Sequence, residues 1–383
     1  MEKREARLKP VWVTHTTAAT ALGNDLDTSW EKLLRGETAI HTVGRFPTQR
    51  YPSRLAACIH DLSPSVNGSM IHPLIDRIIS GIPVLPKETQ LVTATTKGGI
   101  DILEQIRSGL RSDIGDSLPS GIPEYISKKL GLLNKGFNIS AACASSSVAF
   151  SQSAMLIASG KIEVALILCL DLVTEFVFSG FSSLQILSPY PCRPFDRRRS
   201  GLSLGEGGAA ILMMNADRAR KYRYPCLAQA IGWGIAGDAS HITAPARDGE
   251  GLNRAIGIAL RNSGLRAEDI GAIHAHGTGT IYNDEMELTA FKKALDDLPI
   301  PIHSVKGAIG HTLGAAGGIE IAISIKSLSE QVIPPTVGLG KVMKAGIGRI
   351  RPEPVPLSGN CILKTNSGFG GINSAIILRK GER

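Results

Sequence analysis

The sequence predicts an α/β protein, and three observations support that fold class. Short apolar runs alternate along the whole chain with stretches of helical character, as expected of layered strands and helices. The runs 164–170 and 209–214 are apolar without interruption, which is typical of strands covered on both faces. The 42 glycines suit a fold with many tight turns. At 383 residues the chain is long enough for two domains, and no flexible linker or low-complexity segment divides it.

The first part of the chain is expected to open with a strand at 11–14 and a helix at 28–34. Prolines and glycines with irregular apolar spacing predict surface loops over 38–70. The apolar runs predict further strands at 91–95, 137–142, 164–170 and 209–214. The intervening periodic stretches predict helices at 76–82, 101–109, 123–130 and from Cys143 to about Gly160.

The second part repeats this alternation without visible sequence identity to the first. We predict strands at 226–234, 270–275, 302–305, 361–365 and 375–378. We predict helices at 253–263, at 284–295 and from about Gly314.

Composition narrows the function classes. Hydrophobic residues make up 43% and charged residues 20%, as in ordinary globular proteins. The net charge of +8 suits an acidic partner, but the charges are scattered and Arg197-Arg198-Arg199 is the one basic run. With only 5% aromatic residues, nucleic-acid binding is not favoured. No apolar run approaches the roughly 18 residues that a membrane span needs, and residues 1–7 do not resemble a signal peptide, so we expect a cytoplasmic protein.

The six cysteines show no CxxC spacing, which argues against a zinc site, and we predict no metal. A disulfide scaffold is not expected in a chain of this size. Cys143 is the exceptional one, because an apolar run ends there in small residues and a helical segment follows. A helix N-terminus favours a thiolate, so Cys143 is a candidate nucleophile, although a lone cysteine is more often a buried structural residue.

Three further segments place ionisable or glycine-rich sequence at the ends of predicted strands. Residues 274–280 end a strand with His276 and two threonines. Residues 304–320 carry Lys306, His311 and Glu320 within an apolar stretch, where charged groups are seldom buried without a partner or a task. Residues 366–373 form a glycine loop whose N–H groups could line an oxyanion hole. Each feature alone has a structural explanation, but together they form a nucleophile–base set.

These residues identify a resemblance to the elongating β-ketoacyl-acyl-carrier-protein synthases, which have a thiolase fold and a Cys-His-His triad. The resemblance runs from about Val11 to Leu378. It is carried by the segment around Cys143 and by the motifs at 194–201, 205–207, 238–245, 276–280, 306–317 and 368–371.

The resemblance implies a decarboxylative Claisen condensation. Cys143, ionised at its helix terminus, would take an acyl group from a carrier protein. His276 and His311 would stabilise the enolate formed from a malonyl-carrier thioester, and Lys306 would support His311 electrostatically. The N–H groups of Cys143 and Phe369 would hold the oxyanion, and the Phe369 ring would act as a gate over the cysteine.

The other site residues implied by the resemblance bind substrate or support the site. Thr278 and Thr280, with Thr243 as a further contact, would bind phosphopantetheine, and Phe181 would line the acyl pocket. Structural support is expected from Glu320, Asp284 and Glu287. No cofactor is implied beyond the phosphopantetheine of the acyl carrier protein.

The chain departs from the family pattern at three places. Ser367 replaces an aromatic residue two positions before Phe369. Segment 62–90 is shorter and lacks a basic cluster, and a basic position after Phe181 is lost. Carrier proteins are acidic and dock electrostatically, so these changes favour a specialised polyketide or polyene pathway over housekeeping fatty-acid elongation.

The implied architecture is two similar α/β halves in five layers (αβαβα), which we divide at 1–225 and 226–383. A homodimer is expected, with a heterodimer containing a chain-length partner as the alternative. Two other functions stay open: a non-catalytic or partner-dependent chain-length subunit, and a thiolase-type enzyme that uses coenzyme A thioesters. The intact Cys143 argues against the first, and Lys306 with His311 against the second.

Overall fold

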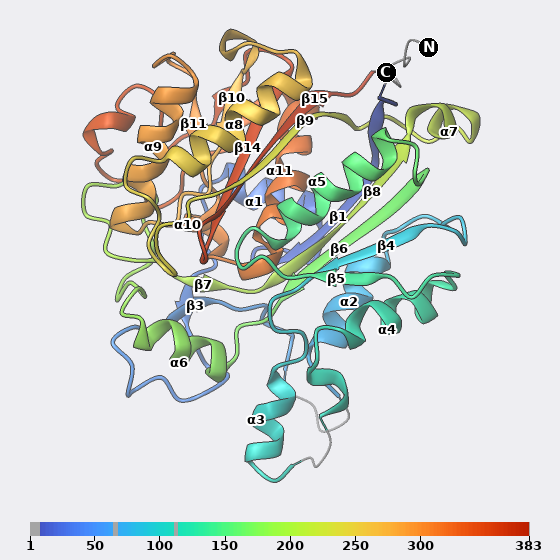
Figure 1. The fold of residues 1–383 in the computed structure, drawn as a ribbon. Coiled ribbons are helices and arrows are strands. Elements are labelled where there is room, and N and C mark those ends of the chain that lie inside the picture. The colour runs from blue at the N-terminus through green and yellow to red at the C-terminus, as the bar shows by residue number, and fades with distance from the viewer. Residues whose placement is uncertain (1–7, 64–67, 111–113, 383) are drawn as a thin grey trace.

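The computed structural model describes residues 8–63, 68–110 and 114–382, and its centre is a ten-stranded mixed sheet (Figure 1). The strand order is β11-β10-β14-β15-β9-β1-β8-β6-β4-β5. The strands of the N-terminal half are β1 (Val11–Thr20), β4 (Gln90–Ala94), β5 (Phe137–Ile139), β6 (Val164–Asp171) and β8 (Gly207–Asn215). Those of the C-terminal half are β9 (Ala228–Gly237), β10 (Ala272–His274), β11 (Ile302–His303), β14 (Cys361–Gly368) and β15 (Ile372–Lys380).

The two halves of this sheet have the same topology. In the first half β4 pairs in parallel with β5 and β6, and β8 runs antiparallel between β6 and β1. In the second half β10 pairs in parallel with β11 and β14, and β15 runs antiparallel between β14 and β9. The halves meet where β1 pairs with β9 over Val11 to Val13. The repeat that the sequence only suggested is therefore present in the strand order.

Helices complete the five layers. α5 (Ser145–Ala158) and α11 (Ala316–Glu330) contact strands of both halves and form the middle layer. α2 (Ile71–Ile79) and α4 (Gly121–Leu130) cover the outer face of the first half, and α8 (Glu250–Ser263) covers the second, with α9 (Ile281–Ala294) beside it. The expected α/β fold with αβαβα layers is thus confirmed.

The remaining elements are short or peripheral. They are α1 (Leu26–Leu34), α3 (Asp101–Arg107), α6 (Glu175–Ser183), α7 (Ala216–Lys221), α10 (Lys306–Ile309), β2 (His41–Thr42), β3 (Leu55–Ala57), β7 (Leu204–Gly205), β12 (Val332–Ile333) and β13 (Val355–Pro356), with 3-10 turns η1 (Gly115–Ser117), η2 (Ala267–Asp269), η3 (Leu313–Ala315) and η4 (Lys344–Gly346). Among the residues described, no helix is long and apolar enough to cross a membrane.

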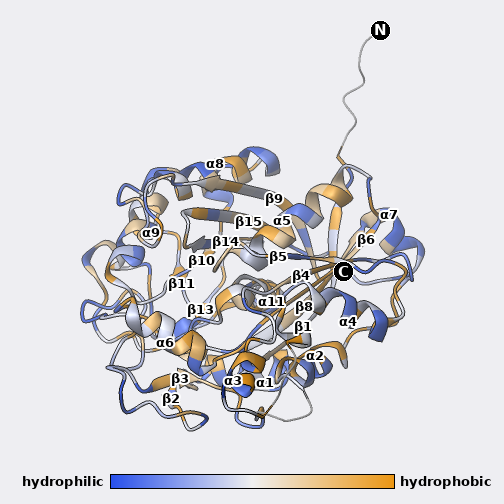
Figure 2. Cartoon of the chain, turned by 60° about the horizontal axis from the view of Figure 1, so that its bottom comes forward, coloured by the Kyte–Doolittle hydropathy of each residue, from blue (hydrophilic) through white to orange (hydrophobic). Residues whose placement is uncertain are grey.

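Burial of the continuous apolar runs makes the core. Every residue of β6 and of β8 is buried, as predicted for strands covered on both faces. Each fully buried Leu, Ile or Met of these strands contributes about 1.5–3 kcal/mol relative to exposure. Figure 2 shows the consequence: hydrophobic colour follows the central strands, and hydrophilic colour gathers on the outer side of helices such as α8.

Several predicted boundaries were wrong. The strand expected at 11–14 is β1 and extends to Thr20, and the strand expected at 137–142 is β5 and ends at Ile139. The helix expected at 76–82 is α2, which begins at Ile71 because Pro73 lies in its first turn, where a proline costs no hydrogen bond. The loops expected over 38–70 include the short strands β2 and β3. The helix expected from Cys143 begins at Ser145. The division at 225 falls between α7 and β9 and stays a prediction, since one hydrogen-bonded sheet crosses it.

Candidate active site

The predicted nucleophile lies in a tight turn between β5 and α5. Ala142 has a φ of 48°, an unusual value for a residue with a side chain, and it turns the chain so that Cys143 precedes the helix. Burial raises the pKa of the Cys143 thiol to about 11, although Lys306 and the N–H of Phe369 oppose the rise. Burial thus favours the neutral thiol in the ligand-free protein, whereas Lys306 and the N–H of Phe369 favour the thiolate, and the expected ionised cysteine stays a prediction.

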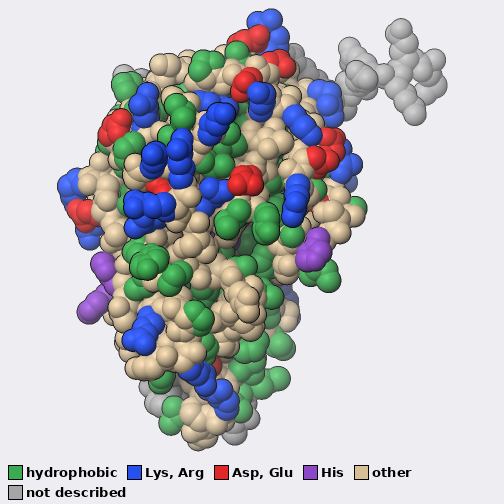
Figure 3. Space-filling view, turned by 90° about the vertical axis from the view of Figure 1, so that its left-hand side faces the viewer, with side chains coloured by type: hydrophobic (Ala, Val, Ile, Leu, Met, Phe, Trp, Pro, Cys, Tyr) green, Lys and Arg blue, Asp and Glu red, His purple; other side chains and the backbone are tan. Residues whose placement is uncertain are grey.

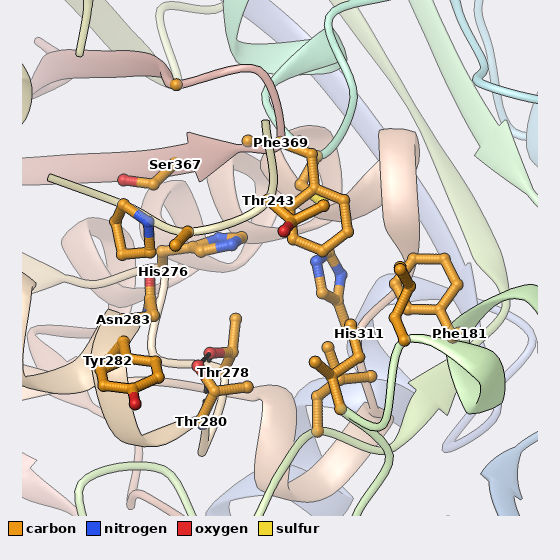
Figure 4. A pocket seen from close by; sticks show the side chains of 18 of the residues that line it. Phe181, Thr243, His276, Thr278, Thr280, Tyr282, Asn283, His311, Ser367 and Phe369 are labelled. Carbon is orange, nitrogen blue, oxygen red and sulfur yellow. Dashed lines mark hydrogen bonds between the residues drawn. The ribbon is translucent and has the colours of Figure 1, made fainter. Parts of the chain in front are cut away.

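The two predicted histidines converge on this cysteine. His276 follows β10, and His311 follows α10. The Cys143 sulfur and one ring nitrogen of each histidine all lie within 4.8 Å of one another, and the two rings meet edge to face with centroids 5.2 Å apart. All three residues are buried. Chain segments more than 130 residues apart in the sequence thus build one cluster (Figure 4).

Hydrogen bonds fix which nitrogen of each histidine carries the proton. Nδ1 of His276 faces two donors, the Asn366 amide at 3.0 Å and the Lys306 ammonium at 3.2 Å. Nδ1 of His311 faces the N–H of Leu313 at 3.1 Å. Both Nδ1 atoms are therefore acceptors, and in the neutral ring the proton is on Nε2.

Both imidazoles are held neutral. Burial lowers the pKa of His311 to about 3, with a further decrease from Lys306 that Glu320 partly offsets. Burial and then Lys306 lower the pKa of His276 well below its ordinary value. Two neutral Nε2–H groups therefore lie beside the sulfur.

A buried charge network stands behind the histidines. Glu320 on α11 accepts hydrogen bonds from Lys306, from Lys364 at 2.5 Å and from Asn366 at 2.9 Å. Burial alone would raise the pKa of Glu320, but Lys306 and Lys364 hold it below its ordinary value. Lys306 was expected to act on His311, yet its direct contacts are with His276, whose backbone oxygen also accepts from Nζ at 2.5 Å.

Sequence reasoning missed Lys364 and Asn366. Lys364 is a fully buried cation inside the apolar strand β14, which is the signal that had marked Lys306. Burial lowers the pKa of Lys364 to about 8, with Glu320 opposing the decrease.

Two acidic residues of α9 hold the loop that carries His276. Glu287 accepts from the N–H groups of His276 and Gly277, both at 2.7 Å. Asp284 accepts from the N–H groups of Thr278 at 3.1 Å and Gly279 at 3.2 Å. Burial raises the pKa of Asp284 to about 6 and that of Glu287 to about 7. Their predicted place as structural supports agrees with these contacts.

A pocket of about 250 Å³ opens onto the cluster. Its lining brings together the predicted residues Cys143, Phe181, Thr243, His276, Thr278, Thr280, His311 and Phe369 (Figure 4). The hydroxyls of Thr278 and Thr280 lie 2.9 Å apart on one wall. Sequence reasoning did not single out Tyr282 and Asn283, which also line this pocket from the start of α9.

The glycine loop places Phe369 over the nucleophile. A Cβ on Gly368 would lie 3.2 Å from the backbone nitrogen of Cys143, so a larger residue would require the two chain segments to move apart by a few tenths of an ångström. The N–H of Phe369 faces the Cys143 sulfur closely enough to oppose the rise in the pKa of its thiol. The Phe369 ring stacks on Phe181 at a centroid distance of 6.0 Å. The Ser367 hydroxyl donates a hydrogen bond to the Asn373 side chain at 2.6 Å. This hydrogen bond occupies the position where the resemblance leads us to expect an aromatic side chain.

Cys143 also lines a second pocket of about 300 Å³. The two pockets share Cys143, Phe181, Leu184 and Phe369. The cluster also has the Cys and His donor atoms of zinc sites and is, within the described ranges, the one group of three side chains with ligand-like spacing.

Comparison with known proteins identifies the family to which this cluster belongs. Residues 87–219 match the model "Beta-ketoacyl synthase, N-terminal domain", and residues 227–340 match "Beta-ketoacyl synthase, C-terminal domain". The chain belongs to the β-ketoacyl synthase family. The resemblance identified from the motifs is thereby confirmed, and Cys143, His276 and His311 all lie within the matched ranges.

Relatives match the chain over nearly its whole length. The chloroplastic 3-oxoacyl-[acyl-carrier-protein] synthase I of Hordeum vulgare is 28% identical, over 97% of this chain and 89% of its own. A putative polyketide β-ketoacyl synthase 1 of Streptomyces halstedii is 28% identical, over 92% and 94%. The solved ishigamide ketosynthase/chain length factor has a TM-score of 0.89 at 24% identity, over 97% and 99%, which shows that this β-ketoacyl synthase shares its fold.

Proposed function

We propose that this β-ketoacyl synthase condenses an acyl group held on Cys143 with a malonyl-acyl carrier protein, releasing carbon dioxide and a β-ketoacyl-carrier thioester. The observation that carries the proposal is the pair of neutral imidazoles within 4.8 Å of the cysteine sulfur. Their Nε2–H groups can donate to one developing oxyanion without giving up a proton.

The first step transfers the acyl group. The Cys143 sulfur bonds to the carbonyl carbon of an acyl-carrier thioester, and the bond from that carbon to the carrier sulfur breaks. The proton of the Cys143 thiol ends on the departing carrier thiol. The N–H groups of Cys143 and Phe369 hold the oxyanion in between, a role supported by the proximity of the Phe369 N–H to the sulfur.

The second step breaks the bond to the malonyl carboxylate. The electron pair moves onto the thioester oxygen as carbon dioxide leaves, and the Nε2–H groups of His276 and His311 stabilise the enolate. Its α-carbon then attacks the acyl carbon, the new carbon–carbon bond forms, and the Cys143 sulfur leaves and takes up a proton from solvent. Neutral histidines suit this step because their Nδ1 atoms are already occupied by fixed donors.

The two pockets would divide the substrates. The first pocket carries both histidines and the threonine hydroxyls, which suit the amides of a phosphopantetheine arm. The second is lined mainly by apolar side chains from α6 and by Leu313, which suit an acyl chain. The stacked rings of Phe181 and Phe369 lie at the boundary between them.

An acidic carrier protein is the expected partner, and an arginine pocket beside the first pocket offers it a place to dock. Segments 186–188 and 200–202 pair side by side, with Ser188 N–H donating to Leu202 at 2.8 Å. Ile186 and Leu202 line the first pocket. From the same two segments, Ser188 and Ser200 line a neighbouring pocket of about 260 Å³ together with Arg193 and Arg198, and we call this the arginine pocket. The Nε of Arg198 lies 4.0 Å from the buried Asp196 carboxylate, and because its side chain is 71% exposed the guanidinium remains accessible to a partner.

The chain retains positive charge elsewhere on its surface as well. Seen from the side of α9, Lys and Arg side chains gather over the upper half of the molecule and are fewer in the lower half (Figure 3). The Ser367 departure and the missing basic positions support a specialised pathway. The expected assembly is a cytoplasmic homodimer or a heterodimer with a chain-length subunit, as in the ishigamide ketosynthase/chain length factor.

Intact-protein mass spectrometry tests the proposal. The wild type, incubated with a panel of acyl-carrier thioesters, should gain the mass of one acyl group, and Cys143→Ala should gain none. Addition of malonyl-carrier should then remove the acyl mass. If the folded wild type takes up no acyl group from any carrier, the autonomous enzyme is refuted, and a non-catalytic or partner-dependent subunit becomes the better assignment.

A further inference from the structure

A lysine, Lys97, is among the residues that line the second pocket, although the binding of a hydrocarbon chain requires no charged group. Most of its lining is apolar: Ala142, Phe176, Val177, Gly180, Phe181, Leu184, Leu313 and Phe369. Thr96 and Lys97 are the polar side chains beside Cys143 in this lining. Lys97 is of intermediate burial, and an ammonium removed from water in such surroundings is costly unless something accepts its hydrogen bonds.

The backbone of Lys97 is fixed by a buried carboxylate. Asp171, at the end of β6, accepts from the Thr95 hydroxyl at 2.7 Å, from the Thr96 hydroxyl at 2.8 Å and from the N–H of Lys97 at 3.3 Å. The next residue, Gly98, has a φ of 57° and would clash with Pro119 if it carried a Cβ. These contacts fix the backbone of the turn, from which Lys97 lines the pocket with its charge close enough to oppose the rise that burial causes in the pKa of the Cys143 thiol.

Among the residues that the structure describes, none makes a direct hydrogen bond or ion pair with the Lys97 ammonium, although from a longer distance its charge opposes the rise that burial causes in the pKa of the Asp171 carboxyl and of the Cys143 thiol. Nearby carboxylates are engaged elsewhere. Asp171 is surrounded by backbone and hydroxyl donors, and it also accepts from the N–H of Gly314 at 2.7 Å. On α3, Glu104 accepts from the N–H of Phe176 at 2.7 Å. On α6, Glu175 pairs with Arg50 and Arg107.

We propose that Lys97 selects acyl groups that carry an oxygen acceptor, a keto oxygen or a carboxylate, along the chain bound to Cys143. This inference rests on the proposed condensing function and names its substrate class. An oxygenated chain supplies the hydrogen bonds that the ammonium lacks, whereas a saturated chain of the same length leaves it unpaired and further removed from water. Sites built to hydrogen-bond a substrate reject analogues that lack the bonding group more strongly than apolar pockets reject a missing methylene.

The experiment compares acylation rates of Cys143 by intact mass, using one carrier loaded with hexanoyl, 5-oxohexanoyl or 4-carboxybutanoyl groups. The keto and carboxylate arms show which oxygen the cation prefers. In the wild type, at least one oxygenated group should react about tenfold or more faster than hexanoyl. Lys97→Met, which keeps chain length without charge, should remove this preference and accelerate hexanoyl transfer. Lys97→Arg should retain the preference.

The possible outcomes are distinct. Acylation by all three groups at similar rates, or a preference for hexanoyl that Lys97→Met leaves unchanged, would overturn the assignment of Lys97 while the condensing function stands. The second of these results is expected if an acidic residue of a second subunit pairs with Lys97. Failure of every thioester to acylate the folded wild type would refute the proposed function, and this inference with it.

Discussion

At the scale of single residues, hydrogen bonds to the two histidines determine which ring nitrogen of each carries the proton. Nδ1 of His276 is fixed by donors from Asn366 and Lys306, and Nδ1 of His311 by a backbone donor. These contacts orient both rings, because a histidine whose Nδ1 accepts must donate through Nε2 when neutral. The reactive sulfur is equally constrained, since its surroundings favour the neutral thiol over the thiolate.

The ionisation of Cys143 can be measured directly. With a thiol pKa raised to about 11, the thiolate fraction should increase about tenfold for each pH unit between 7 and 10. The alkylation rate of Cys143 by iodoacetamide, followed by mass spectrometry, should rise in parallel without levelling off. The reaction at Cys143→Ala gives the background from the other cysteines. A rate that levels off near pH 7 would show instead that the helix terminus and Lys306 outweigh burial.

Much of this site was predictable from the sequence. Cys143 and His276 each follow a predicted strand, His311 lies between a predicted strand and a predicted helix, and their residue types suggest one chemistry. The protonation state of Cys143 was not predictable, because it depends on burial that only the assembled fold produces. Lys364 was overlooked although the strand at 361–365 was predicted, because an alternating strand can turn one lysine to solvent, whereas β14 buries this lysine fully.

At the scale of elements, the Glu320 network joins three segments. It ties α10 through Lys306 and β14 through Lys364 to the middle-layer helix α11. One carboxylate thus compensates two buried ammonium groups. Such an arrangement does not imply high stability, but removal of its single anion leaves two charges unpaired in the interior.

Glu320→Gln should therefore lower the free energy of unfolding by about 3–5 kcal/mol. The matched control is Glu330→Gln on the same helix, which breaks an exposed pair with Lys326 and should cost under about 1 kcal/mol. Urea unfolding followed by circular dichroism measures both changes. Equal, small losses for the two variants would mean that Lys306 or Lys364 loses its proton in the variant or reaches water.

Among the helices that were not predicted from the sequence are α6 and α10, and each has its own physical reason. α6 carries few charges and borders the pockets, so its pattern did not separate a buried from a solvent face. α10 spans only Lys306–Ile309 and is too short for periodicity to show. Long buried strands such as β6 and β8 were found because burial on both faces leaves a continuous apolar run.

At the scale of the whole molecule, the repeated topology explains where the site lies. Equivalent strand orders place β5 and β11 at the outer edges of the two half-sheets, with β4 and β10 next to them, and α5 and α11 pack between the two halves. Cys143 comes from the first half, and both histidines come from the second. The sequence indicated the alternation of strands and helices, but pairing of β1 with β9 depends on long-range contacts that no local pattern specifies.

The arginine pocket lies beside the first pocket, so docking of the carrier protein can be altered without changing the catalytic residues. A charge-reversal variant of Arg198 tests this docking. Arg198 lines the arginine pocket beside the first pocket, whereas Arg266 precedes β10 at the end of that strand opposite His276. Their side chains are 71% and 81% exposed. If the arginine pocket docks an acidic carrier, Arg198→Glu should slow acylation by a carrier-bound thioester about tenfold at low salt, mainly through slower association.

Arg198→Glu should leave acylation by the same acyl group on free pantetheine unchanged, because that donor has no protein surface to dock. Arg266→Glu, with the same change in net charge, should affect neither donor. The difference between the variants should shrink as ionic strength rises from 10 to about 500 mM, because the Debye length then falls from about 30 Å to a few ångströms. If Arg198→Glu and Arg266→Glu slow acylation by the carrier-bound thioester equally, the net charge of the protein attracts the carrier and the arginine pocket is not a specific docking surface. Slower transfer from pantetheine as well would place Arg198 in the binding of the arm itself.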